Sequence, residues 1–115
     1  MNEKMEKAIS ILTLLYFFSL AFDFTVSVTT FLRDKEYFLN YEMNQFFKKF
    51  LIDYDFVSLF VMAFASSLPF LLSSWFFFFN RKIKGIHLLI LFIITSSVLI
   101  ILTIGHIFGG LSWLI

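Results

Sequence analysis

The feature that most constrains this chain is a long apolar run over residues 9–32 that contains one charged side chain, Asp23. At about 1.5 Å per residue, a helix of this length measures roughly 36 Å, enough to cross a hydrocarbon core of about 30 Å. An acidic side chain in such a span costs about 2.5 to 3.5 kcal/mol on insertion scales and rarely faces lipid. The run therefore predicts a membrane-spanning helix whose acidic residue faces protein or a polar site.

The composition favours a membrane protein and excludes several other classes. Hydrophobic residues make up 60% of the 115 residues and charged residues 15%, too few charges for the surface of a soluble domain of this size. The formal net charge is +1 and the basic residues are scattered near the ends of apolar runs, so no nucleic-acid partner is indicated. The chain has no cysteine, which excludes disulfides, iron–sulfur clusters and thiolate metal sites. We expect no cofactor, and the sequence leaves open whether a metal binds.

Two further apolar runs, over about residues 56–79 and 86–106, are also long enough to span. The segment between the first two runs, about residues 37–52, is too short and too polar to cross, and as a helix it has an apolar and a polar side. We therefore predict a single all-α membrane domain over residues 1–115, with three transmembrane helices and one amphipathic interfacial or re-entrant helix. Pro69 in the second run predicts a kink near the middle of that span, where nearby serines can satisfy the freed carbonyl.

The first run has a polar side when it is placed on a helix. At about 100° per residue, Asp23 shares one narrow stripe with four other polar side chains, Tyr16, Ser19, Ser27 and Thr30. The stripe is expected to face a bundle interior or an oligomer interface. Two interpretations of Asp23 stay open: a protonated side chain that bonds to Ser19 or Ser27 and only fixes helix register, or a contact for an ion, a proton or a substrate.

The third run carries two histidines and a close-packing motif. His87 and His106 are 19 positions apart, about 28 Å along a helix, so they cannot bind one metal together. Each is interpreted as an interfacial histidine, since a ligand role would need partners from other helices. Gly105 and Gly109 have the small-xxx-small spacing that permits close helix packing.

Charge near the span ends predicts the orientation. With three spans, the N-terminus and the second loop share one side. That side carries five basic residues, against four on the other side: Lys4, Lys7, Arg81, Lys82 and Lys84, against Arg33, Lys35, Lys48 and Lys49. Cytoplasmic loops carry an excess of Lys and Arg, so we predict the N-terminus inside and the C-terminus outside a cytoplasmic-type membrane. Four polar residues can then converge in the outer half of the bundle and form a candidate polar or ion site: Asp23, Glu42, Asn44 and His106.

The stretches LAFDFTVSVTTFL and YEMNQFFKKFL resemble an uncharacterised family of small prokaryotic, often archaeal, membrane proteins. That family has an Asp in the first span followed by Thr, then a Glu-x-Asn-Pro motif and two further spans. The matching positions are Asp23, one of Ser27 or Thr29, Glu42 and Asn44, whereas Gln45 stands where the family has proline. The resemblance covers the first half of the chain and implies an architecture and a polar cluster, without an activity.

Three classes of function are compatible with these features. The first is an accessory or structural subunit of a larger membrane complex, or a homo-oligomer, whose partners are the bilayer and other membrane helices. The second is a proton or cation conduit or carrier that uses Asp23 and Glu42. The third is an intramembrane enzyme in which the same two carboxylates act as acid and base or hold a hard cation. The chain shows no nucleophile motif, phosphate loop or metal spacing, which favours the first class.

Overall fold

The computed structural model describes residues 2–41, 45–55 and 57–115, and every regular element in these ranges is a helix. In chain order the helices are α1 (Asn2–Arg33), α2 (Lys35–Tyr41), α3 (Gln45–Tyr54), α4 (Val57–Ser66), α5 (Pro69–Phe79) and α6 (Ile86–Ser112). The prediction of an all-α fold is confirmed for the described part of the chain.

Three segments are long and apolar enough to cross a membrane: Glu3–Arg33, Val57–Phe79 and Ile86–Ser112. They coincide with the three predicted runs, although the first helix begins before residue 9 and the third continues past residue 106. Only 17%, 17% and 22% of their most apolar windows are buried inside the chain. Most of the surface of each helix therefore faces outward.

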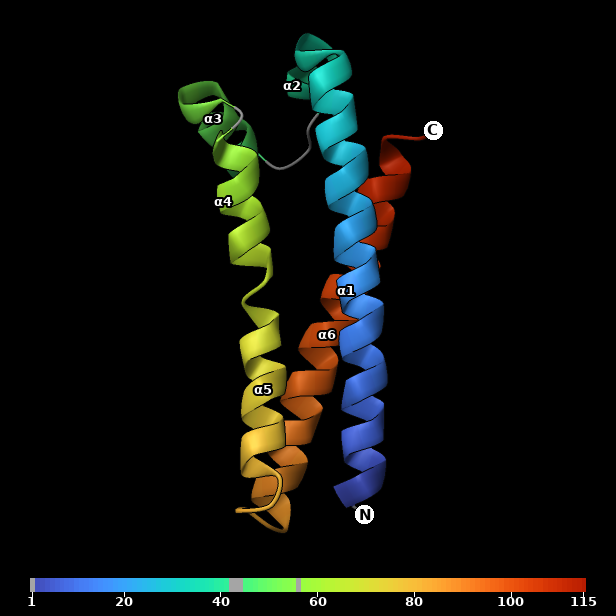
Figure 1. The fold of residues 1–115 in the computed structure, drawn as a ribbon, viewed down its shortest axis with the longest axis vertical. Coiled ribbons are helices and arrows are strands. Elements are labelled where there is room, and N and C mark those ends of the chain that lie inside the picture. The colour runs from blue at the N-terminus through green and yellow to red at the C-terminus, as the bar shows by residue number, and fades with distance from the viewer. Residues whose placement is uncertain (1, 42–44, 56) are drawn as a thin grey trace.

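Helices α1 and α6 run in the same direction and form the most extensive contact of the fold, and the α4–α5 segment runs the other way beside them (Figure 1). The N-terminus and the turn between α5 and α6 lie at one end of the molecule. At that end the side-chain amide of Asn80 donates a hydrogen bond of 2.6 Å to Glu6. Helices α2 and α3 and the C-terminus lie at the other end (Figure 1).

Two short helices, α2 and α3, occupy the segment predicted as one amphipathic helix over residues 37–52. The residues between them, 42–44, lie outside the described ranges, so the predicted placement of Glu42 and Asn44 near Asp23 stays a prediction. Lys35 at the start of α2 forms a salt bridge of 3.0 Å with Asp55, just after α3. This ion pair links the two short helices at the surface, where it adds little stability.

The second apolar run is divided into α4 and α5 at the proline, where the sequence predicts a kink (Figure 1). Pro69 has no N–H for the carbonyl of Ala65, and that carbonyl accepts a bond of 3.2 Å from the Leu68 N–H instead. The backbone thus changes from i→i+4 to i→i+3 hydrogen bonding around residues 67–71. The break lets α4 and α5 follow different directions.

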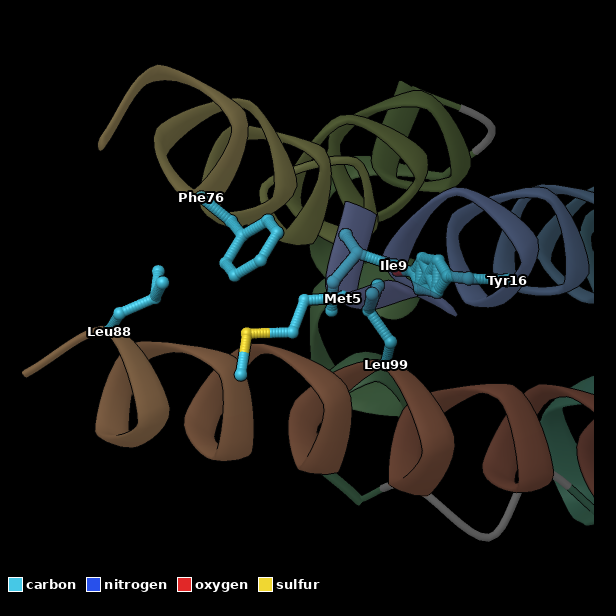
Figure 2. Packing of buried hydrophobic residues seen from close by; sticks show 6 residues of the cluster. All are labelled: Met5, Ile9, Tyr16, Phe76, Leu88 and Leu99. Carbon is cyan, nitrogen blue, oxygen red and sulfur yellow. The ribbon is translucent and has the colours of Figure 1, made fainter. Parts of the chain in front are cut away.

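Two groups of buried apolar side chains hold the helices together. The first core cluster joins α1, α5 and α6 near the N-terminal end and is shown in Figure 2: Met5, Ile9, Tyr16, Phe76, Leu88 and Leu99. The second core cluster joins α1, α2, α3 and α4 near the opposite end, with one residue from each: Phe31, Phe38, Leu51 and Leu59. Asp23 lies between them in the sequence of α1, so its polar surroundings separate two apolar cores.

Candidate functional site

Helices α1 and α6 are joined by a carboxyl–imidazole pair between the two core clusters. His106 Nδ1 lies 2.7 Å from Asp23 Oδ2, and the two side chains are 18% and 22% exposed, respectively. The other carboxyl oxygen, Oδ1, accepts a bond of 3.2 Å from the Ser27 hydroxyl. When Asp23 is ionised, its carboxylate can only accept hydrogen bonds, so His106 Nδ1 carries the hydrogen and donates it to Oδ2.

Two glycines on α6 allow the two helices to approach at the pair. A Cβ atom at Gly109 would lie 3.1 Å from both oxygens of Asp23, and one at Gly110 would lie 2.3 Å from the ring of Phe22. The other glycine of the predicted packing motif, Gly105, has no atom within 4 Å of its Cβ position. The close approach therefore depends on Gly109 and Gly110, of which only Gly109 belongs to the packing motif predicted from the sequence.

Tyr16 connects the pair to the break in the second apolar run. Its ring packs edge-on against the His106 ring, with centroids 5.6 Å apart, and its hydroxyl donates to the carbonyl of Ser66. That carbonyl ends α4, and the Phe70 N–H that would bond to it in a continuous helix donates to Ser67 instead, at 3.0 Å. A side chain from α1 thus satisfies one carbonyl released by the break, and the Ser67 hydroxyl donates to another, that of Phe64, at 2.6 Å, as expected for a serine beside Pro69.

The remaining residues of the predicted polar stripe bond within their own helix. Ser19 donates to the Tyr16 carbonyl at 2.8 Å, and Thr30 donates to the Val26 carbonyl at 2.8 Å. Such bonds to a preceding turn are common for Ser and Thr in helices. Of the four stripe residues, only Ser27 bonds to Asp23.

A cavity of about 370 Å³ adjoins the carboxyl–imidazole pair. Its lining comes from α1, α2, α4 and the C-terminal part of the chain: Leu20, Asp23, Phe24, Ser27, Tyr41, Leu59, Met62, Ala63, Ser66, His106, Phe108, Gly109, Ser112 and Trp113. Tyr41, Phe108 and Ser112 are exposed, so the cavity opens at the surface of the chain. A concave, mainly apolar space with a few converging polar groups is the usual form of a small-molecule site.

The aromatic part of this lining was not identified from the sequence. Phe24, Tyr41, Phe108 and Trp113 all border the cavity. Trp113 follows α6 and stacks on Phe38, with ring centroids 4.6 Å apart and planes 13° from parallel, which holds the indole in place. The sequence offers one sign that an aromatic side chain lies near Asp23, namely that Phe24 directly follows it. Tyr41, Phe108 and Trp113 come from distant parts of the chain, so only the fold brings them to the cavity.

The chemistry open to this arrangement is narrow. Within the described ranges, no group of three or more His, Asp or Glu side chains is placed to hold a metal ion. Asp23 retains acceptor capacity, since a carboxylate offers about four lone-pair sites and two are used by His106 and Ser27. The pair can bind a polar or cationic group from the cavity, or exchange a proton with it.

Comparisons with known proteins gave no match: no protein-family model, no curated protein and no solved structure matches the chain. The resemblance to small prokaryotic membrane proteins with an intramembrane Asp therefore stays a prediction. The functional proposals rest on the geometry around Asp23 and His106.

Proposed function

We propose that this chain is a three-span integral membrane protein that binds a small amphipathic molecule in the cavity beside Asp23 and His106. The observation that carries the proposal is the open cavity of about 370 Å³ next to a carboxyl–imidazole pair. A polar pair that only fixed two helices would need no opening beside it. Here the pair forms one wall of a space that is otherwise mainly apolar.

The exposed apolar surface supports membrane insertion. Leu14, Phe18, Phe64 and Ile101 are all more than half exposed, as are many other large apolar side chains of the three long segments. In water this surface would be unfavourable by about 25 cal/mol per Å². Helices also satisfy their own backbone hydrogen bonds, as a spanning segment must.

The orientation that we propose places the N-terminus and the basic turn of residues 80–84 inside. Helices α2 and α3 and the C-terminus would then lie at the outer face, with the two short helices at the membrane interface. The cavity lies toward the same end, because Tyr41 of α2 and Trp113 contribute to its lining. A ligand would therefore enter from the outer half of the bilayer or from the outer interface.

The lining suits a molecule with an apolar body and one polar end. Leu20, Leu59 and Met62 offer apolar walls, whereas Asp23 and His106 offer hydrogen bonds at one side. Binding in such a site draws on apolar burial for affinity and on the few polar groups for orientation.

The experiment compares the molecules retained by two variants of α4. Ala63 lines the cavity and Ala65, on the same helix, is exposed and does not line it, so Ala63→Trp fills the space while Ala65→Trp controls for bulk. Each protein is purified in mild detergent and extracted, and small molecules are identified by mass spectrometry. The proposal expects a molecule bound to wild type and Ala65→Trp and lost from Ala63→Trp. Equal retention by all three proteins would contradict it.

A second candidate is the accessory subunit or homo-oligomer predicted from the sequence. The observation that favours it is the low buried share of the three spans, 17% to 22%, which leaves helix surface for partner helices. Purification from native membranes tests this candidate, because an accessory subunit would remain with its complex. If the Asp23–His106 pair helps to shape the interface, Asp23→Asn would release the subunit from the complex. The carrier and enzyme hypotheses that pair Asp23 with Glu42 stay predictions, since Glu42 lies outside the described residues.

A further inference from the structure

We infer that the ligand of this cavity is a monovalent organic cation, that Asp23 is its counter-ion, and that a proton on His106 competes with it. The inference rests on the proposed function and specifies the chemical class of the ligand. Three features carry it: the charge of the lining, the free acceptor sites of Asp23 and the aromatic side chains around the cavity.

The charge of the lining is negative when His106 is neutral. Among the described residues that border the cavity, Asp23 is the one acid, His106 is the one base, and neither Lys nor Arg is present. The basic residue of α2, Lys35, does not line the cavity; its ammonium group instead forms a salt bridge of 3.0 Å with Asp55. A carboxylate in a site of low dielectric is stabilised strongly by an opposite charge. The cavity therefore favours a cation over a neutral molecule and disfavours an anion.

The carboxylate forms part of the cavity wall with bonding capacity to spare. His106 and Ser27 each occupy one acceptor site, on different oxygens. Gly109 presents no side chain above the carboxyl group, and the same glycine borders the cavity. A cationic group in the cavity can therefore approach Asp23 while the bond to His106 remains.

The aromatic lining points to an organic cation rather than a metal ion. Faces of Trp, Tyr and Phe attract alkylammonium groups, and Phe24, Tyr41, Phe108 and Trp113 border the cavity. A hard metal cation instead prefers six or more oxygen ligands or a close set of His and acidic groups. The described residues offer no such set of three.

Protonation of His106 supplies the charge that the ligand would otherwise supply. An imidazolium donating to Asp23 makes the pair neutral overall. The proton on His106 and the organic cation therefore compete to balance the charge of the same carboxylate. The titratable groups around His106 are Tyr16 and Asp23 of α1 and, across the cavity, Tyr41 of α2. Helix α4 contributes Met62 and Ser66, whose side chains stay neutral. Protonation of His106 is therefore expected to weaken cation binding, and bound cation is expected to oppose protonation of His106 to the same extent.

The test uses Trp113 as the reporter. The chain has two tryptophans, so Trp75→Phe leaves Trp113, which borders the cavity, as the single tryptophan, and its emission is excited selectively over that of the tyrosines. The purified protein in detergent is titrated with benzyltrimethylammonium and with neopentylbenzene, its uncharged isostere, and the saturable fluorescence change gives each apparent Kd. We expect the cation to bind at least tenfold more tightly than the isostere, and Asp23→Asn to remove this preference.

Two further variants keep the test informative if Asp23→Asn unfolds. Ser112→Lys adds a positive charge at the exposed edge of the cavity without altering the pair and should abolish cation binding, whereas Ser112→Gln should retain it. His106→Gln keeps a donor for Asp23 but cannot titrate, so it should bind the cation with little dependence on pH.

The outcomes separate the two proposals. Equal binding of cation and isostere, unchanged by Ser112→Lys, would overturn the cation assignment and leave the binding function standing. A pH dependence that persists in His106→Gln would overturn the role of the His106 proton. Saturable binding of neither compound would count against both the cation assignment and the proposed function.

Discussion

Gly110→Ala is the substitution whose effect the structure specifies most closely. Gly110 is buried on α6, and a Cβ atom there would lie 2.3, 2.6 and 3.1 Å from three ring carbons of Phe22 on α1. Carbon atoms in contact prefer a separation of about 3.5 to 4.0 Å. The Phe22 ring, or the whole of α6, must therefore move by more than about 1 Å to accept a single methyl group.

The size of the effect follows from what can move. Overpacking a well-packed contact costs about 1 to 3 kcal/mol. Phe22 is only partly buried, and the atoms in conflict are at the outer part of its side chain, so the ring can rotate away at the lower end of this range. We expect Gly110→Ala to be less stable than Gly105→Ala, which has the same gain in helix propensity, by about 1 to 2 kcal/mol, a factor of about 5 to 30 in the folding equilibrium.

The assay is reversible unfolding of the purified protein in mixed micelles, followed by far-UV circular dichroism as the denaturing detergent is increased. Gly105→Ala is the matched control, because it changes the same residue type on the same helix where no atom lies within 4 Å. Alanine is favoured over glycine in a helix by up to about 1 kcal/mol, so this control should be unchanged or more stable. If Gly110→Ala is as stable as Gly105→Ala, the close contact between α1 and α6 is refuted.

Three further predictions concern two other contacts and the orientation of the chain. Tyr16→Phe leaves the Ser66 carbonyl without its hydroxyl donor and should destabilise the fold by about 1 kcal/mol in the same unfolding assay, whereas an unchanged midpoint would contradict that bond. Thr95→Val should stabilise the fold by about 1 kcal/mol, because the buried Thr95 hydroxyl has no hydrogen-bond partner in the described part of the chain; a loss of stability would reveal a bond. Single cysteines at Asn2 and Ile115 of this cysteine-free chain test orientation: an impermeant maleimide should label intact cells only at position 115, and the reverse pattern would contradict the proposal.

The helices were predictable because membrane-length apolar runs are a strong signal. Each run became a long helix or, at Pro69, two consecutive helices. Parallel first and third spans also bring Asp23 and His106 to similar levels, whereas their contact at 2.7 Å depends in addition on which faces of α1 and α6 meet.

Other parts of the site depend on three-dimensional packing that periodicity cannot give. Helical spacing places Ser19, Asp23 and Thr30 on one side, but it does not determine that Ser19 and Thr30 bond to their own backbone. The close contact made by Gly110 and the cavity lining by Trp113 depend on how α6 crosses α1 and where it ends. The break at Pro69 also directs α4, and no local rule predicts that Tyr16 bonds to its last carbonyl.

Solid-state NMR of the protein in bilayers measures directly whether Asp23 and His106 form a hydrogen-bonded pair. With ¹⁵N-labelled histidine and ¹³Cγ-labelled aspartate, a Nδ1···Oδ2 separation of 2.7 Å requires strong dipolar dephasing of one histidine nitrogen. If the two side chains are paired, this dephasing remains in His87→Gln and disappears in His106→Gln. The absence of dephasing in the wild-type protein would contradict the pair and the site built around it.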